Sequence, residues 1–432
     1  MKKSLLAVAA IGAFASAAQA QSSVTVYGIL DVGYVGGNAR VAEGGTKSAT
    51  QNTVQKATQN SFDNNAESTS RLGFKGTEDL GGGTSAFFTV ELGLAPSDSQ
   101  SGFKSATTTE NRQSFAGLKK NGIGDFAIGT QYTALHNAVA ATDAAGTNNI
   151  LGDMIYTSAT ASATNTGAGV KDDNFAANNG FGAGNSYTIR ANNTLTVNTA
   201  TFAGFTGHGI VIMNNNNSTQ TSNYASSNGY VGGTNNQNGW GLGLDYAWNK
   251  LFVTAQLQQL NAKQAYNSTG VTVAANTPSA VATAYGISIF GAGQASTLGT
   301  NVKDNQYYVG ATYDFGILKA YAQYINRKVT AQQDTGFYAK RTGEQIGVRS
   351  YITPVIEAWA QGGLGKTTAF GASNPAANMT SWQVGSNYYL SKRTNLYAIY
   401  GQVGTSNVSI INSQNPSSFN ASNYAVGVRH TF

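Results

Sequence analysis

The sequence predicts an all-β protein whose sheet closes into a transmembrane barrel, and three observations carry this prediction. Only 11% of the 432 residues are charged, against about a quarter in typical globular proteins, while Tyr (22) and Phe (19) are abundant. Apolar and polar residues alternate along many separate segments. After the first twenty residues no apolar run reaches the roughly 18 residues that a spanning helix needs. A helical membrane protein, a disordered chain and an ordinary cytosolic enzyme are therefore all disfavoured.

The N-terminus has the features of a secretory signal peptide. Lys2 and Lys3 precede an apolar stretch from Leu5 to Ala18, and Ala18-Gln19-Ala20 forms a small-residue cleavage site. We expect residues 1–20 to be removed, leaving residues 21–432 as a single domain because no linker or change of composition divides them. The chain has no cysteine, which excludes disulfides, thiolate metal ligands and a thiol nucleophile.

In the clearest example, large apolar residues alternate one by one with small or acidic ones. The large apolar residues are Trp240, Leu242, Leu244, Tyr246 and Trp248. Similar period-2 patterns predict further strands. They lie in Val24–Val35, Ala86–Leu94, Arg112–Leu118, Gly124–Tyr132, Ser186–Val197, Gln306–Asp314, Leu318–Arg327, Val355–Gly365, Trp382–Leu390 and Thr394–Val403.

Short turns alternate with long polar connections along the chain. Asn249-Lys250 and Phe315-Gly316 are typical turns, whereas the long stretches are Asn38–Thr69, Ala134–Asn185, Asn214–Gln237 and Gln264–Val302. A closed antiparallel sheet pairs every backbone group internally, as hydrocarbon requires, and short turns at one rim with long loops at the other are typical of outer-membrane barrels. The length fits about 16 strands, with 14 or 18 also compatible. A soluble β-sandwich is the alternative, but it rarely needs so long a chain without a domain break.

The chain ends within an alternating strand. Tyr424, Val426, Val428, His430 and Phe432 share one face, and the last of them is the carboxyl-terminal residue. An aromatic ending of this kind resembles the signal that the outer-membrane assembly machinery binds, so we expect that machinery to be a partner.

Four segments resemble the general porins of Gram-negative bacteria, especially their beta-proteobacterial branch. They are Ser22–Gly33, Ser70–Gly83, Leu390–Tyr400 and Val426–Phe432. The resemblance implies a 16-stranded barrel with short periplasmic turns and long extracellular loops, the third of which folds into the pore. It also implies a homotrimer in the outer membrane, in contact with lipid and lipopolysaccharide, that passes small hydrophilic solutes and ions and needs no cofactor.

The resemblance further implies a pore constriction between basic wall residues and acidic loop residues. Arg71 and Lys75 alternate with Leu72 and Phe74, so the period of 2 independently turns both towards the lumen. Arg112 and Arg190 match positions of further wall arginines, and Arg190 lies opposite to Tyr187, Ile189, Leu195 and Val197.

The expected acids of the constriction lie on one strand and on one loop. Glu91 lies on the inward face of its strand, and Ala134–Asn185 matches the constriction loop, with the acids Asp143, Asp153, Asp172 and Asp173. Because basic residues outnumber acids on the wall, we expect a mild anion preference.

Other functions remain as alternatives. A substrate-specific channel would show saturable block by one solute, and an outer-membrane adhesin would show no conductance. An enzyme is not expected, since the three histidines, His136, His208 and His430, lack suitably spaced catalytic partners. The sequence predicts neither a metal site nor binding of nucleic acid.

Overall fold

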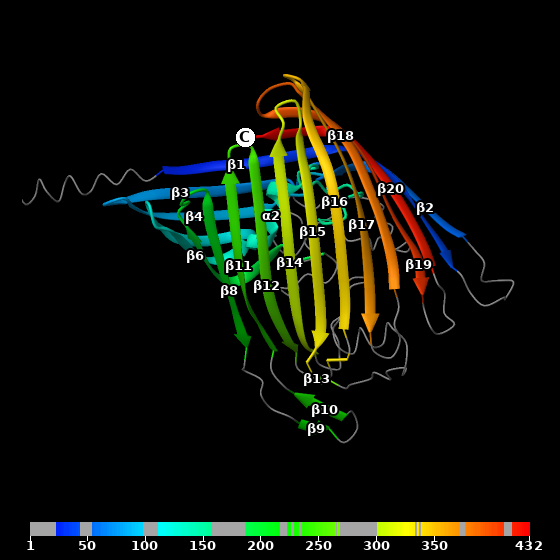
Figure 1. Cartoon of the computed structure of the whole chain (residues 1–432), viewed down its shortest axis with the longest axis horizontal. Coiled ribbons are helices and arrows are strands. Elements are labelled where there is room, and N and C mark those ends of the chain that lie inside the picture. The colour runs from blue at the N-terminus through cyan, green and yellow to red at the C-terminus, as the bar shows by residue number, and fades with distance from the viewer. Residues whose placement is uncertain are drawn as a thin grey trace, which may run out of the picture.

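The architecture is described from a computed structural model, shown in Figure 1. It describes residues 23–43, 54–97, 111–156, 186–216, 223–225, 229–232, 235–264, 266–267, 300–332, 335–336, 338–370, 376–409 and 417–432. The expected signal peptide and its cleavage site lie outside these residues. Within them, no helix has both the length and the apolar character needed to cross a bilayer.

The main sheet contains 17 strands and closes on itself. In chain order they are β1 (Ser23–Glu43), β2 (Val54–Asn64), β3 (Arg71–Gly81), β4 (Thr84–Gly93), β5 (Asn111–Lys120), β6 (Gly124–Tyr132), β7 (Arg190–Thr199), β8 (Phe205–Asn216), β11 (Asn235–Trp248), β12 (Leu251–Gln264), β14 (Thr300–Asp314), β15 (Lys319–Ala331), β16 (Tyr338–Thr353), β17 (Ile356–Phe370), β18 (Ala376–Tyr389), β19 (Thr394–Ser409) and β20 (Ser417–Thr431). Apart from β2 and β3, strands that follow one another in this sheet's sequence order are antiparallel neighbours in space, and β20 pairs with β1 from Ile29↔Thr431 to Glu43↔Ser417.

Strands β2 and β3 together occupy one position in the ring. Both pair with the same edge of β1, which faces β3 over Ser23–Ile29 and β2 over Val32–Ala42. Residues 65–70 interrupt them, and the buried Asp31 carboxylate accepts hydrogen bonds from the backbone N–H groups of Glu67 (2.8 Å) and Ser68 (2.6 Å). The barrel therefore has 16 strand positions, which confirms the predicted fold class.

Hairpin turns at one rim are short. The turn between β3 and β4 consists of Gly81, Gly82 and Gly83, all with positive φ angles of 59° to 83° that favour glycine, and β14 meets β15 through residues 315–318. The opposite rim carries the long connections, including a separate sheet of β9 (Asn223–Ala225), β10 (Gly229–Gly232) and β13 (Tyr266–Asn267) (Figure 1).

The two faces of the sheet follow the period-2 pattern. Trp240, Leu242, Leu244 and Trp248 lie on the outer face with 40% to 61% of their surface exposed. On other strands, inward side chains such as Thr254 (β12), Gln306 (β14) and Gln383 (β18) are buried. An apolar exterior around a polar interior is the arrangement that a lipid-embedded barrel requires.

Two predicted boundaries differ from the structure. The stretch Asn38–Thr69 is not one connection, because β1 continues to Glu43 and β2 covers Val54–Asn64. Neither segment alternates large apolar residues with polar ones along its length, and this alternation is the pattern used to predict strands. Strand β7 begins at Arg190, and the preceding Tyr187 and Ile189, expected on the outer face, are instead buried in the lumen.

Candidate pore constriction

A buried ion pair lies at the centre of the wall formed by β3 to β7. The Nε atom of Arg112 (β5) donates a hydrogen bond to Glu91 Oε1 (β4) at 2.7 Å. An Arg71 (β3) guanidinium nitrogen lies 3.6 Å from the same oxygen. Arg112 is 1% exposed and Glu91 is 3% exposed. One carboxylate therefore faces two guanidinium groups, which compensates the cost of burying these charges.

A β-bulge turns Arg112 towards the lumen. Glu91 pairs with Gln113 but Leu92 pairs with Asn111, so Arg112 is the extra residue of β5. Bulges commonly re-aim a side chain in this way. The strict period of 2 therefore does not apply at Arg112.

Two tyrosines connect the remaining basic residues to this ion pair. Tyr27 (β1) donates to Glu91 Oε2 at 3.0 Å, and the Lys75 ammonium lies 5.4 Å from the centre of the Tyr27 ring. Arg112 donates to the Tyr132 hydroxyl at 2.6 Å, and the Arg190 guanidinium lies 5.6 Å from the centre of that ring. We call Arg71, Lys75, Glu91, Arg112 and Arg190, with these two tyrosines, the basic cluster. Its four cations and one carboxylate leave a formal charge of +3.

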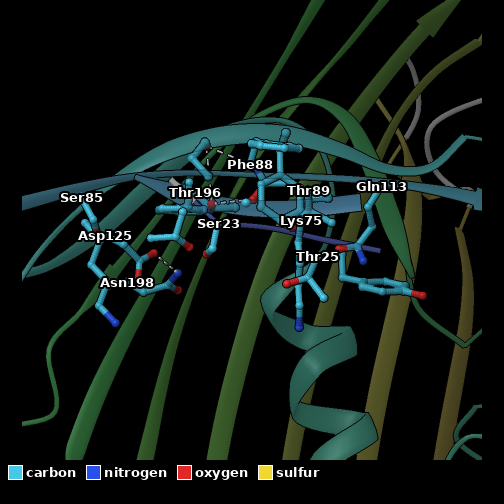
Figure 2. A pocket seen from close by; sticks show the side chains of 18 of the residues that line it. Ser23, Thr25, Lys75, Ser85, Phe88, Thr89, Gln113, Asp125, Thr196 and Asn198 are labelled. Carbon is cyan, nitrogen blue, oxygen red and sulfur yellow. Dashed lines mark hydrogen bonds between the residues drawn. The ribbon is translucent and has the colours of Figure 1, made fainter. Parts of the chain in front are cut away.

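The basic cluster borders a cavity of about 710 Å³. Lys75, Thr25, Thr89 and Gln113 line it, and Figure 2 shows Lys75 and Thr25 projecting into it on the side of the helix. The lining also includes Asn137 of helix α2 (Ala134–Thr142). The cavity thus lies between the basic wall and the segment that follows β6.

That segment, residues 134–156, is docked against the opposite wall. Helix α2 begins at the N-cap Thr133, whose hydroxyl accepts from the His136 N–H at 3.1 Å. Leu135 and Val139 pack against Tyr308 (β14) and Ile325 (β15), and Figure 1 shows α2 beside these strands inside the barrel. Further along, Ile150 packs against Trp359 and Ile399. We call residues 134–156 the inner loop.

Inward-facing glutamines on neighbouring strands bind the backbone of the inner loop. Gln323 donates to the Val139 carbonyl (3.3 Å), Gln345 accepts from the Met154 N–H (2.7 Å), and Gln361 accepts from the Ala145 N–H (3.0 Å). Gln383 donates to the carbonyls of Ile150 (3.1 Å) and Leu151 (2.9 Å). We call these four residues the glutamine row. It supplies the hydrogen bonds that the backbone of a buried loop requires.

Small residues allow the inner loop to lie close to the wall. A Cβ atom at Gly401 would lie 1.6 Å from the Leu151 carbonyl oxygen. On the loop side, Gly152 has a φ of +106° and a Cβ there would lie 2.2 Å from the Trp382 carbonyl oxygen. These glycines therefore fit the inner loop tightly against β18 and β19.

The two described acids of the inner loop cap its own turns. Asp143 accepts hydrogen bonds from the backbone N–H groups of Ala145 (3.2 Å) and Thr147, and Asp153 accepts from those of Ile155 and Tyr156, both at 2.7 Å. Burial raises the pKa of the Asp143 carboxyl well above its ordinary value, and the Asp153 carboxylate raises it further. Both side chains are buried beside the glutamine row rather than exposed to the cavity.

The structure thus brings together one part of the predicted constriction. Arg71, Lys75, Arg112, Arg190 and Glu91 belong to one cluster, whereas Asp143 and Asp153 lie in the inner loop, and Asp172 and Asp173 fall outside the described residues. The sequence analysis missed Tyr27, Tyr132 and the glutamine row. The glutamine row could have been found from the sequence, because glutamine recurs at inward positions of neighbouring strands, for example Gln345 opposite Gln323.

Comparisons with known proteins agree with this architecture. The profile of the Gram-negative porin family matches residues 7–408. An outer membrane porin protein of Bordetella pertussis is 26% identical, with full coverage of both chains. An anion-selective porin from Comamonas acidovorans has the same fold, with a TM-score of 0.61, 21% identity and coverage of 95% of this chain and 100% of that one. The trimer form of OmpT from Vibrio cholerae has a TM-score of 0.57 at 13% identity, covering 95% of this chain and 99% of its own. This chain therefore belongs to the Gram-negative porin family and is an integral outer-membrane protein.

Proposed function

We propose that the chain is a passive diffusion channel for small hydrophilic solutes and ions, with a preference for anions. The observation that carries this proposal is the basic cluster beside the cavity, with the inner loop packed against the opposite wall. Solutes would pass between them. A net positive charge beside a narrow opening raises the local concentration of anions.

Arg71, Lys75, Glu91, Arg112 and Arg190 are the proposed wall of the constriction. Asp143 and Asp153 are proposed to act from the loop side, by fixing the turns that hold the inner loop in place. We further propose that three chains assemble into a trimer, that the strand ending at Phe432 binds the assembly machinery, and that the chain acts without catalysis or cofactor.

Lys75→Glu tests the anion preference. The Lys75 side chain is exposed in the lumen, so reversing its charge changes the field without breaking the buried pair of Arg112 and Glu91. The zero-current potential of the purified protein in a planar bilayer under a salt gradient should shift towards cations. Lys392→Glu makes the same charge change in the short turn between β18 and β19 and should shift it much less.

Three outcomes would contradict the proposal. Equal potentials for Lys75→Glu, Lys392→Glu and the unmodified chain would show that the basic cluster does not set selectivity. Saturable block by one solute would indicate a substrate-specific channel. The absence of any conductance would favour an adhesin.

A further inference from the structure

Two phenylalanines lie on the inner face of the wall that borders the cavity. Phe87 (β4) shares the inward face of its strand with Thr89 and Glu91, and Phe115 (β5) pairs directly with Thr89. Both phenylalanines are half-buried, and both line the cavity. Because phenylalanine forms no hydrogen bond through its side chain, these two residues depart from the polar pattern of a barrel lumen. We call them the phenylalanine pair.

The two rings form one aromatic surface. Their centres are 6.3 Å apart and their planes are inclined at 77°, which is the edge-to-face arrangement that aromatic rings favour. The Phe87 ring lies over β5 at Gly117, where a Cβ atom would lie 2.7 Å from Phe87 Cζ. Gly129 on β6 lies directly opposite Phe115. The neighbouring strands therefore place no bulky side chain at these two positions, and the aromatic surface is reached from the cavity.

Two lysines flank Phe87 at diagonal positions of the sheet. Lys75 on β3 pairs with Thr89, and Lys119 on β5 pairs with Ser85, so each is two residues out of register with Phe87. Diagonal neighbours on one face of a sheet are about 7–8 Å apart. Both lysines are exposed, and within the part of the chain that the structure describes neither ammonium group forms an ion pair. One aromatic ring therefore has a cation on each side.

Two carboxylates on the same part of the wall do not cancel this charge. Asp125 lies directly opposite Lys119, but its Oδ1 atom accepts a hydrogen bond from Asn198 Nδ2 at 2.7 Å. Asp79, near the end of β3, accepts a hydrogen bond from the Gly81 N–H at 2.8 Å in the short turn. With Lys119 and both acids included, the basic cluster and its surroundings keep a formal charge of +2. The wall around the phenylalanine pair therefore favours anions.

The phenylalanine pair also lies on the proposed path of solutes. Figure 2 shows Ser85 on one side of the cavity and Thr89 with Lys75 on the other, and Phe87 lies between Ser85 and Thr89 along β4. The pair is thus placed between the basic cluster and the short-turn rim. A solute that passes the basic cluster passes these rings as well.

We propose that the phenylalanine pair, Lys75 and Lys119 form a weak binding site for aromatic carboxylates inside the channel. The inference rests on the proposed function and adds to it the class of anion that the wall retains. The ring of the solute stacks on the phenylalanine pair, which removes apolar surface from water. Its carboxylate meets the ammonium group of Lys75 or Lys119. An aliphatic carboxylate uses only the lysines and a neutral aromatic solute uses only the rings.

Benzoate is the probe for this site in the intact protein, reconstituted in planar bilayers. Added to a chloride electrolyte, it should reduce the single-channel current in a saturable way. Acetate carries the same charge without a ring, and benzyl alcohol carries the ring without a charge, so both should bind about tenfold more weakly. Phenylacetate carries both groups and should bind as benzoate does. A block shared by both acids distinguishes a class of solutes from one specific substrate.

Phe87→Thr with Phe115→Thr tests the role of the rings. The double variant should bind benzoate about tenfold more weakly. Because its charge is unchanged, its zero-current potential in a chloride gradient should equal that of the unmodified chain. Phe252→Thr is the matched control, since Phe252 (β12) also faces inward, opposite Thr312. Its diagonal neighbours are the acids Asp245 and Asp314 instead of lysines, so this variant should keep the benzoate affinity.

Lys119→Gln tests the role of the charge. It should weaken benzoate binding about threefold and leave the weaker binding of benzyl alcohol unchanged. Lys120→Gln removes the next lysine, which lies on the other face of β5 and donates a hydrogen bond to the Gly82 carbonyl at 2.7 Å. This control should bind benzoate as the unmodified chain does.

Equal affinities for benzoate and acetate in the unmodified chain would overturn the proposal, and so would an unchanged benzoate affinity in the double phenylalanine variant. If that variant failed to fold, Phe115→Leu would make the comparison, because it keeps an apolar side chain without a ring. It should weaken binding of benzoate but not of cyclohexanecarboxylate, and an equal effect on both would overturn the proposal. In each case normal chloride conductance leaves the channel proposal intact, whereas absent conductance would be a failure of the channel itself.

Discussion

The inner surfaces of the two halves of the barrel carry similar polar residues in different surroundings. On β15 to β18, the glutamine row is buried under the inner loop and its amides bind loop backbone. On β3 to β7, side chains such as Lys75 and Gln113 border the cavity. The same inward polar pattern therefore serves as a docking surface on one side and as a solute-facing wall on the other. Only the presence of a segment with matching donors and acceptors distinguishes them.

The two halves also treat charge differently. The basic cluster lies on the open side of the barrel, the wall that borders the cavity, and contains four cations and one carboxylate. In the covered half, the wall under the inner loop, charged side chains have partners close to them. There, Arg327 pairs with Asp304 at 2.7 Å and Arg349 with Glu357 at 3.5 Å, and Arg341 donates a hydrogen bond to the Met154 carbonyl at 3.0 Å. Charge on the covered side holds structure together, while the excess on the open side is available to act on ions.

Glu91→Gln should have the largest effect, because it breaks the buried pair of Arg112 and Glu91 on the open side. Arg112, which is 1% exposed, would lose its counter-charge, and such a loss costs about 3–5 kcal/mol. We expect a lower free energy of unfolding, measured by denaturant titration in detergent, and a stronger anion preference in bilayers. Glu78→Gln, an exposed carboxylate near the short turn after β3, should change neither by much. An unchanged unfolding free energy for Glu91→Gln would show that the pair contributes little.

Replacing an inward glutamine by leucine in each half shows whether the glutamine row holds the inner loop. Gln383→Leu would leave the carbonyls of Ile150 and Leu151 without the amide that they bind, and each buried unpaired group costs about 1–3 kcal/mol. We expect a less tightly docked inner loop, seen as larger or noisier single-channel currents and faster cleavage of the loop by added protease. Gln113→Leu, on the cavity wall, should leave both measurements near those of the unmodified chain. Equal behaviour of the two variants would mean that the glutamine row does not hold the loop.

The sequence reveals the barrel more completely than its interior. Period-2 alternation finds the outer stripe of Trp240 to Trp248 and the lumen side of Arg71 and Lys75, because burial on one face of a strand is a local property. It fails at Arg112, where a bulge resets the alternation. It also fails at Tyr187, whose apolar ring packs against the inner loop in the lumen instead of lipid. The contacts of Gln383 with Leu151 join residues far apart in the chain, so no local pattern indicates them.

The smallest expected effect concerns the proton on Asp143. Its pKa is raised in the docked inner loop, first by burial and then by Asp153, so at a pH between the ordinary and the raised pKa docking is coupled to uptake of a proton. Docking is therefore most favourable below the ordinary carboxyl pKa of about 4 and weakens as the pH rises through the raised value.

Ala145 donates to Asp143 Oδ1 and Thr147 to Oδ2, so Asp143→Asn keeps an acceptor for one of these N–H groups while it removes the titration. This variant should gain in loop docking at a pH above the raised pKa, measured as slower protease cleavage of the inner loop, and its cleavage rate should vary less with pH than that of the unmodified chain. Asp125→Asn, which removes a carboxylate at the cavity on the open side, should keep the pH dependence of the unmodified chain. Faster cleavage of Asp143→Asn at every pH would contradict this prediction. It would show that the ionised Asp143 carboxylate stabilises the turn despite its burial.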